Sequence, residues 1–271
     1  MEDKMINVLE ASEALDVPAI EIIEEASGGR IGGALLKDGE WSIPLSSLGS
    51  VSISHSQGSK SASWYEKRPL PDGFQERMRK IARGEEIDRI ALEGNEIGLL
   101  RTDGRTFRCI FNENRKNLYN GEFLAHSAEN DYESSSCYIT EDGLAGFSIT
   151  PDGHLVSLFS NSRYRGFAKA IAHIVRRDAR LLSCIAVDMD SSLIRLYRDC
   201  FGFEVLARTR DDTELFGKYY GREFIDAFVS AKGHPFHVFM ARCGKRGRDI
   251  MVFDGYFEAD RYMKEGEWTS T

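Results

Sequence analysis

The chain has 271 residues, of which 42% are hydrophobic and 29% charged, a composition typical of a globular protein that buries a sizeable core. No apolar run approaches the ~18–20 residues that a membrane-spanning helix needs, and the beginning of the chain is acidic rather than signal-like. The five cysteines are odd in number and never spaced as CxxC, which favours reduced thiols. We therefore expect a cytoplasmic protein without a membrane partner. The net charge of −8 argues against a general nucleic-acid binder.

The negative charge is unevenly placed, because residues 1–100 carry nearly all of the excess of acids over bases. Such a surface either keeps the protein in solution or attracts a cationic partner or substrate. The sequence leaves both interpretations open.

The first hundred residues mix helical and strand-like patterns, without a repeat or a low-complexity tract. Asp38-Gly39 between two apolar runs predicts a hairpin turn. Phe74, Met78 and Ile81 at i, i+4 and i+7 predict a helix. Pro18 interrupts the helix-like stretch around it or marks a start. The elements expected in this part are a helix over 13–25, a hairpin over 31–45, a strand over 51–55 and a helix over 74–82.

The middle of the chain is predicted to consist mainly of short strands. A second hairpin is expected over 96–111, across the turn signal Asp103-Gly104, followed by a polar stretch over 112–129 that permits a helix. Two further Asp-Gly turns predict an antiparallel meander. Its three strands are expected over 136–140, 144–150 and 154–160.

A helix is expected to begin at Arg163, because an apolar face runs from Phe167 to Val175. The near-continuous apolar run over 181–187 is typical of a buried parallel strand, so strand, helix and strand would form a right-handed crossover. The elements expected next are a helix capped by Asp190 or Ser191, a strand over 203–208, a helical insert over 213–231 and a strand over 235–242. The tail over 244–271 carries no pattern that predicts its structure.

The junction after the third strand of the meander has the residues of an anion-binding site. The turn Ser160-Asn161-Ser162 leads into Arg163, Tyr164, Arg165, Gly166, Phe167 and Ala168. A helix start leaves about four backbone N–H groups unpaired, and the helix dipole adds partial positive charge there. Gly166 and Ala168 have no bulk to keep a phosphate from the backbone, and the arginines bring full charges. These residues predict a binding site for a pyrophosphate.

The pattern Arg-x-x-Gly-x-Ala over 163–168 resembles the Gln/Arg-x-x-Gly-x-Gly/Ala motif of the GNAT acyl-CoA N-acyltransferases, which stands at the same strand–helix junction. The stretch Leu196-Tyr197-Arg198-Asp199-Cys200-Phe201-Gly202-Phe203-Glu204-Val205 resembles the Leu-Tyr…Gly-Phe stretch that follows the fifth strand of that family. The family usually places four residues from the Tyr to the Gly, and this chain places five. The order of predicted elements over 105–243 also resembles the GNAT fold.

The resemblance implies acetyl-CoA as co-substrate, held by the residues from Arg163 to Ala168. Splaying of the fourth and fifth strands would leave backbone N–H groups near Val156 and Leu158 free to pair the pantetheine arm and polarise the thioester.

Attack by a neutral amine on that thioester requires a base, and departure of the thiolate requires an acid. A tyrosine, with an ordinary pKa of about 10, suits the acid, so Tyr197 is the candidate. A packed core aromatic fits its place on an apolar stripe equally well. His154 is the candidate base because it titrates near neutrality, and Glu141 and Asp188 are the alternatives.

Two other clusters of polar residues allow both a functional and a purely structural interpretation. His234, His237 and Cys243 are of the types that bind zinc, but alternation along a strand would point the two histidines to opposite faces, so we expect no metal site. The arginines of the run over 176–180 would contact nucleic acid or the CoA 3′-phosphate, or form a solvated helix end.

The sequence thus predicts an α/β protein with a mixed (α+β) sheet. Residues 105–243 would form a GNAT-like acyltransferase domain, residues 1–104 an additional α/β lobe of unassigned role, and residues 244–271 a C-terminal extension. The function implied by the resemblance is transfer of an acetyl group to a primary amine of a small molecule or a protein. The alternatives are a GNAT-fold binding or inhibitory module without catalysis and a nucleic-acid-modifying protein. Neither the acceptor nor the oligomeric state follows from the sequence.

Overall fold

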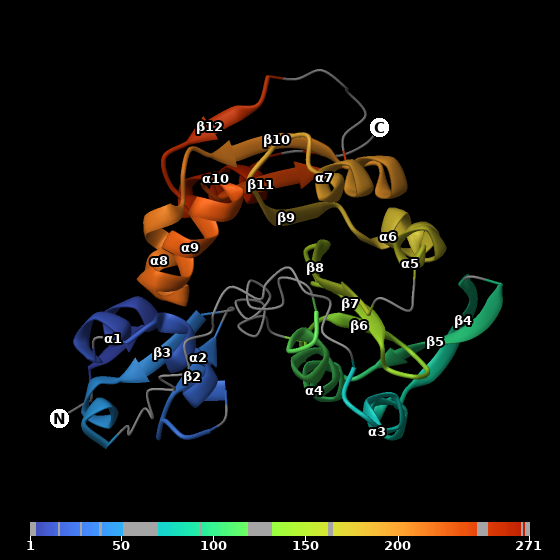
Figure 1. Cartoon of the computed structure of the whole chain (residues 1–271), viewed down its shortest axis with the longest axis horizontal. Coiled ribbons are helices and arrows are strands. Elements are labelled where there is room, and N and C mark those ends of the chain that lie inside the picture. Colours follow the sequence, from blue (N-terminus) through green and yellow to red (C-terminus); the bar gives the residue numbers. More distant parts are fainter. Residues whose placement is uncertain are drawn as a thin grey trace.

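The computed structural model describes residues 4–15, 17–27, 29–37, 40–50, 70–92, 94–118, 132–161, 165–242, 249–266 and 268. It is a mixed α/β protein with two sheets, one of three strands and one of nine (Figure 1). The strand expected over 51–55 and the polar stretch from 119 onward lie outside the described residues. In the described part of the chain, no helix is both long and apolar enough to cross a bilayer.

The three-stranded sheet and two helices form a small lobe. Its strands pair antiparallel in the order β1-β3-β2, and Ile22 and Ile23 of the second helix are buried in one core with Ile43 of the sheet. The hairpin expected over 31–45 is confirmed by the pairing of β2 with β3. The helix expected over 13–25 is two helices, because Pro18 has no backbone N–H to donate and the second helix begins after it. The elements are β1 (Met5–Asn7), α1 (Val8–Leu15), α2 (Ala19–Ser27), β2 (Leu35–Lys37), β3 (Glu40–Pro44) and the 3₁₀ helix η1 (Leu45–Ser50).

The small lobe packs against a helical insertion of the large unit (Figure 1). This insertion consists of α8 (Thr213–Tyr220) and α9 (Arg222–Lys232), which lie between two strands of the large sheet along the chain. Tyr219 packs against the core of the lobe, and Lys218 Nζ lies 3.1 Å from Glu13 Oε1. The insertion expected over 213–231 is therefore helical, and the small lobe packs against it.

The large sheet has the strand order β12-β10-β11-β9-β8-β7-β6-β5-β4. β8 pairs with β9, and β10 with β12, in parallel, while the other neighbours are antiparallel. The meander and the parallel strand after it are confirmed as β6 (Ser136–Thr140), β7 (Ala145–Ile149), β8 (His154–Ser160) and β9 (Leu181–Ala186). The other strands are β4 (Glu85–Leu92), β5 (Asn95–Thr102), β10 (Glu204–Thr209), β11 (Phe236–Ala241) and β12 (Met251–Phe253).

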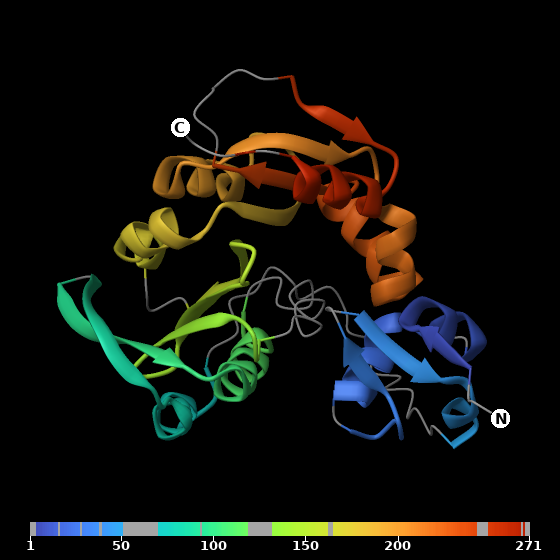
Figure 2. The same cartoon turned by 180° about the vertical axis from the view of Figure 1, so that it is seen from behind.

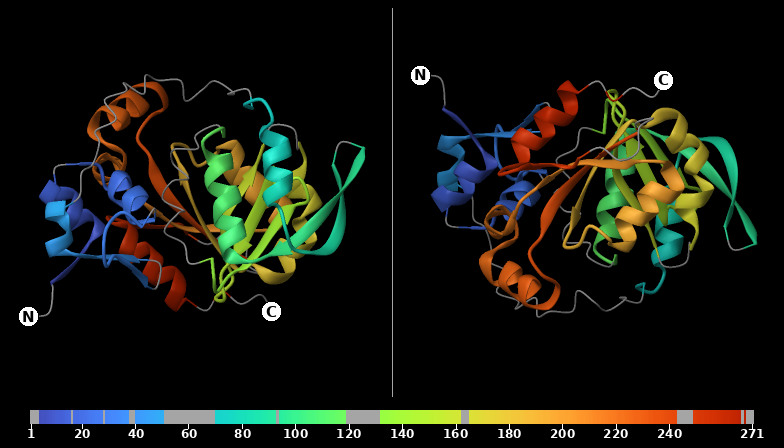
Figure 3. Two further views of the ribbon diagram at one scale, coloured as in Figure 1. Left: turned by 90° about the horizontal axis from the view of Figure 1, so that it is seen from below. Right: turned by 90° about the horizontal axis from the view of Figure 1, so that it is seen from above.

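Helices cover both faces of the large sheet (Figures 2 and 3). On one face, α5 (Phe167–Ala170), α6 (Ala172–Asp178), α7 (Ser192–Leu196) and the π-helical turn η3 (Tyr197–Phe201) enclose the main core. On the other face, α3 (Phe74–Ile81) and α4 (Gly104–Arg115) pack on the meander, and α8, α9 and α10 (Tyr256–Glu265) pack on β9, β10 and β11. The helix expected over 74–82 is confirmed as α3.

The hairpin expected over 96–111 is wrong in its second half, which is the helix α4. Asp103 caps this helix, because its Oδ1 accepts a hydrogen bond of 2.8 Å from the backbone N–H of Thr106. Phe107, Ile110 and Phe111, at i, i+3 and i+4, are buried beneath it. The Asp-Gly pair therefore begins a helix instead of turning a hairpin, and β5 forms its hairpin with β4.

The domain boundaries expected at 104 and 244 do not coincide with the units of this fold. β4 and β5 are hydrogen-bonded into the large sheet, so the large unit includes residues from Glu85 onward. The tail contributes β12, which pairs with β10, and α10, whose Ala259 and Met263 are buried against Leu206 and Phe239. It is an integral part of the large unit.

The helix expected to begin at Arg163 begins at Phe167, because Gly166 caps it with a left-handed φ of 89°. Arg163 and Tyr164 lie outside the described residues. The helix expected next is confirmed as α7, and its cap is Ser191, whose Oγ accepts a hydrogen bond of 3.3 Å from the N–H of Ile194.

Candidate functional site

β8 and β9, at the centre of the large sheet, are paired at one end alone. Two residue pairs join them, His154 opposite Leu181 and Leu155 opposite Leu182. From Val156 to Ser160, β8 has no ladder partner in β9. Backbone N–H and C=O groups inside a protein need partners. The unpaired edge of β8 is therefore a place where a ligand can meet the backbone.

A bulge lies in β8 beside this edge. Between the pairs Ser148–Val156 and Gly146–Phe159, β8 has one residue more than β7. The extra residue interrupts the ladder and re-aims its neighbours. Ser157 in the bulge has a φ of 54° and is the one non-glycine residue of the described chain with a positive φ.

A cavity of about 430 Å³ joins the unpaired edge of β8 to the helices that follow it. Four predicted cofactor-binding residues line it together with Tyr197, so the structure brings the two motifs of the sequence to one place. Val156 and Arg165 are not in this lining. The lining residues are Leu158, Phe159, Ser160, Gly166, Phe167, Ala168, Lys169, Leu193, Leu196 and Tyr197.

The turn beside the cavity is cationic and open to solvent. Arg165 and Gly166 are exposed, and the space where a side chain of Gly166 would begin is empty within 4 Å. Phe167 is 2% exposed and belongs to the main core, so it offers a ligand its backbone rather than its ring. Lys169 also lines the cavity. Lys169 was not predicted from the sequence, and it lies in α5, whereas Arg165 lies in the turn before that helix.

Tyr197 also lines the cavity and is 9% exposed, with its ring stacked on Phe201 at 6.1 Å between centroids. Burial raises the pKa of Tyr197 well above its ordinary value, and negative charge on Cys184 adds to this effect. Burial also raises the pKa of the Cys184 thiol to about 12. At neutral pH, the hydroxyl of Tyr197 and the thiol of Cys184 are therefore both protonated.

The π-helical turn η3 accommodates the five-residue spacing from Tyr197 to Gly202. Such a turn takes in one residue more than an α-helical turn and is frequent at functional sites. Gly202, with a φ of 76°, ends the helix, and its N–H donates to the carbonyl of Arg198 at 3.0 Å. The five-residue spacing therefore does not keep Tyr197 from lining the cavity.

The three candidate bases lie elsewhere. His154 is at the paired end of β8, four residues before Leu158, which corresponds to roughly 13 Å along a strand. Burial lowers the pKa of His154, and its Nε2 lies 3.4 Å from Ser183 Oγ. Glu141 and Asp188 are exposed. None of the three lines the cavity, so the structure does not bring a candidate base to its tyrosine.

The two histidines considered for zinc are each paired with a carboxylate. His237 Nδ1 lies 2.8 Å from Asp212 Oδ2 in a buried pair, and His234 Nδ1 lies 3.2 Å from the more exposed Asp211 Oδ2. Cys243 lies outside the described residues, and among those that are described no group of three or more His, Cys, Asp or Glu could hold a metal ion.

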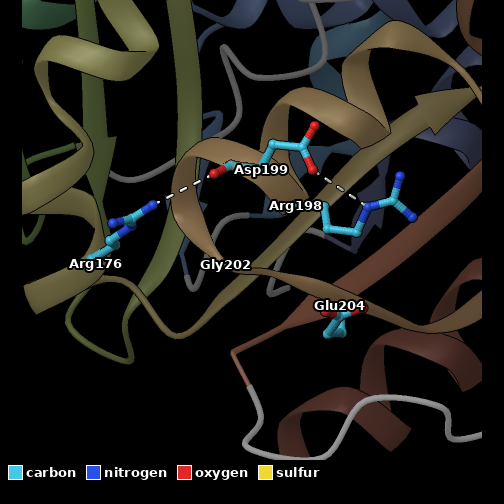
Figure 4. A pocket seen from close by; sticks show the side chains of 5 residues that line it. All are labelled: Arg176, Arg198, Asp199, Gly202 and Glu204. Atoms are coloured by element: carbon cyan, nitrogen blue, oxygen red, sulfur yellow. Dashed lines mark hydrogen bonds and ion pairs between the residues drawn. The ribbon is translucent and has the colours of Figure 1, made fainter.

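A second cavity, of about 590 Å³, lies on the other side of η3 (Figure 4). Arg176 donates to the backbone carbonyl of Asp199 at 3.5 Å, and Arg198 Nε lies 3.7 Å from Asp199 Oδ1. Glu204 also lines it. This lining mixes both signs of charge and contains no histidine, cysteine or hydroxyl that could act as a nucleophile or shuttle a proton at neutral pH.

Comparison of the chain with models of known protein families, with curated proteins and with solved structures finds no match. The function must therefore be argued from the site. Around one cavity, the site brings together Lys169, open backbone at a glycine turn that follows the exposed Arg165, an unpaired strand edge and a buried protonated tyrosine. This combination of features suits a long ligand with a phosphate end and a reactive end.

Proposed function

We propose that the protein is a GNAT-type N-acyltransferase that moves an acetyl group from acetyl-CoA to a primary amine. The observation that carries the proposal is the cavity that joins the unpaired edge of β8 to Tyr197. The order of elements after the meander supports it, since a helix, a parallel strand, a second helix and two closing strands follow one another. That order is the one the sequence resemblance implies.

In this proposal the pyrophosphate of acetyl-CoA lies at the exposed turn from Arg165 to Ala168, with Lys169 as a further cation. The pantetheine arm follows the unpaired edge of β8 and hydrogen-bonds backbone N–H groups near Leu158, which lines the cavity, whereas Val156 is paired with Ser148 of β7 and does not line it. The same groups stabilise negative charge on the thioester oxygen as the amine attacks, because they are fixed in place before the reaction begins.

The chemical step transfers the acyl group to the amine and one proton to the leaving sulfur. The amine nitrogen bonds to the thioester carbon, the C–S bond breaks, and the hydroxyl of Tyr197 gives its proton to the sulfur. The nitrogen loses one proton to solvent water, because the described lining of the cavity holds no base, and Tyr197 regains a proton from solvent. The hydroxyl of Tyr197 is protonated at neutral pH, and because burial raises its pKa it is a weaker proton donor than an ordinary tyrosine. Cys184 remains a thiol and does not compete as a nucleophile.

A second candidate is a module of the same fold that binds CoA without transfer. One observation favours it: the ten residues that line the cavity include no carboxylate and no imidazole to deprotonate the amine. The two candidates differ in turnover and agree in ligand binding, so binding and turnover have to be measured separately.

The acidic first part of the chain supports a cationic acceptor. Residues 1–50 hold ten acids and three bases, and the lobe that they form is carried by α8 of the large unit. We propose that amines with several positive charges, such as polyamines, aminoglycosides and lysine-rich proteins, are the acceptors to test first.

Acetyl-CoA binding tests the proposal directly. A ligand at 100 times its Kd stabilises the folded protein by ~2.7 kcal/mol. At roughly 2–4 °C per kcal/mol for a protein of this size, the melting temperature should rise by several degrees. Replacing both Arg163 and Arg165 with Glu should abolish the rise, because carboxylates would then stand where phosphates sit.

The matched control reverses two exposed arginines far from the cavity, Arg79 and Arg261. It should keep the full thermal shift. An unchanged shift after reversal of Arg163 and Arg165 would place the cofactor elsewhere, and the absence of any shift in the unmodified protein would overturn both candidates.

A further inference from the structure

Tyr132 lies directly beneath the bulge of β8. It is fully buried, and its hydroxyl is 2.6 Å from Ser157 Oγ, which is also buried. The tyrosine ring packs on Phe107, with 4.9 Å between centroids, and on Phe111, with 6.3 Å. The guanidinium of Arg108 lies 5.4 Å from its ring centre. These contacts hold the ring, and so the position of its hydroxyl is fixed.

The backbone of Ser157 has a conformation that residues with a Cβ disfavour. Its φ of 54° lies in the left-handed region, which glycine enters freely. A serine there requires a compensating contact that is lost when the backbone relaxes. The hydrogen bond between its side chain and Tyr132 is such a contact.

Tyr132 acts from the side of the sheet opposite to the cavity. Its neighbours Phe107 and Phe111 belong to α4, whereas the helical residues of the cavity lining belong to α5, α7 and η3, and Tyr132 is not among the lining residues, although Phe159 of its cluster is. The tyrosine therefore has access to a ligand through the backbone of β8 and not by direct contact.

We propose that Tyr132 is a positioning residue whose hydroxyl clamps Ser157 in the left-handed conformation and thereby holds the bulge that presents the unpaired edge of β8 to the ligand. The inference rests on the proposed function in one respect, that the ligand is acetyl-CoA. A role in packing alone would need the ring of Tyr132 and not its hydroxyl.

Two substitutions of Ser157 separate the clamp from packing. Ser157→Ala and Ser157→Gly both remove the hydroxyl, but alanine keeps the Cβ that disfavours a positive φ and glycine does not. We expect acetyl-CoA to bind about tenfold more weakly to the alanine variant, the order of one lost hydrogen bond, and within threefold of the unmodified protein to the glycine variant. Equal affinities of the two variants would overturn the clamp.

Rescue tests the part played by Tyr132. Tyr132→Phe should weaken acetyl-CoA binding about tenfold, and adding Ser157→Gly should restore it, since glycine keeps the bulge without a clamp. Tyr138→Phe, at a tyrosine that is 5% exposed on the other face, is the matched control and should bind as the unmodified protein does. A double variant as weak as Tyr132→Phe alone would overturn the proposal.

Amide hydrogen exchange provides a readout that does not depend on the identity of the ligand. The clamp predicts faster exchange of residues 156–159 in Ser157→Ala than in Ser157→Gly, because the bulge is held in the second variant alone. If the unmodified protein fails to bind acetyl-CoA, the proposed function is wrong. The difference in exchange between Ser157→Ala and Ser157→Gly still tests the clamp in that case. Equal exchange in both variants would refute it.

Discussion

Tyr197→Phe is the sharpest test of the reaction, because it removes one oxygen and keeps the ring that stacks on Phe201. As general acid, the hydroxyl should be worth ~10²–10⁴-fold in kcat, the usual contribution of a positioned acid. At 1.36 kcal/mol for each factor of ten, this corresponds to ~3–5 kcal/mol in the barrier. Among the described residues the hydroxyl has no hydrogen-bond partner, so the substitution should shift the melting temperature by less than ~2 °C.

The assay measures free thiol released from acetyl-CoA with a panel of amines, alongside the Kd for acetyl-CoA by calorimetry. The Kd should stay near that of the unmodified protein, and Tyr138→Phe should leave both quantities unchanged. Because burial raises the pKa of Tyr197, the acid stays protonated as the pH rises, so kcat should show no loss from its ionisation up to about pH 10. Turnover of the variant within threefold of the unmodified protein would remove Tyr197 from the mechanism and favour the module that binds without transfer.

Two further predictions concern charge, and one concerns packing. If the acidic lobe attracts a cationic acceptor, kcat/KM should fall as salt is added, since charges are screened beyond ~8–10 Å at physiological ionic strength, and a salt-insensitive kcat/KM would argue for solubility alone. Burial acts to raise the pKa of Asp212, but hydrogen bonds from His237 and Thr209 outweigh it, so the folded pKa lies below the unfolded one. The stability from this carboxylate is present above about pH 4 and is lost as the pH falls through the folded pKa. Asp212→Asn should therefore lower the melting temperature at pH 7 and make the melting temperature fall less steeply in acid. A melting temperature that falls as steeply in the variant would contradict this. Phe167→Ala should cost ~3–5 kcal/mol in urea unfolding, because the ring is 2% exposed in the main core, and a loss under ~1 kcal/mol would show that the site collapses around it.

Local signals predicted the parts of the fold that local interactions decide. The Asp-Gly turns at 142–143 and 152–153 gave the meander, and the apolar run of β9 gave the parallel strand. The hairpin predicted across Asp103-Gly104 is wrong, because an aspartate before a glycine suits a hairpin turn and a helix cap equally well. The helix buries Phe107, which favours the cap over the turn. The pairing of β12 with β10 depends on contacts far apart in the chain, which no short pattern reports.

Some parts of the candidate site could be predicted from the sequence, and other parts depend on distant contacts. The resemblance implied that residues around Gly166 and Tyr197 would serve one ligand, and both residues line one cavity. The positive φ of Ser157 has no signature in the sequence, since glycine or asparagine would be expected there. Its side chain is hydrogen-bonded to Tyr132, which is 25 residues away, and no short pattern reports such a contact. A candidate base could not be chosen from the sequence, because His154 lies on the right strand but at its paired end.

The joint between β8 and β9 has a mechanical consequence. Two residue pairs connect the five strands on one side of it to the four on the other. With so few hydrogen bonds across the joint, side-chain packing has to hold the two parts of the sheet together. The main core does this, because Phe147 and Leu155 on one side belong to the same buried cluster as Leu182 and Val238 on the other. The unpaired edge of β8 therefore keeps its place beside β9 through a shared core rather than through a backbone ladder.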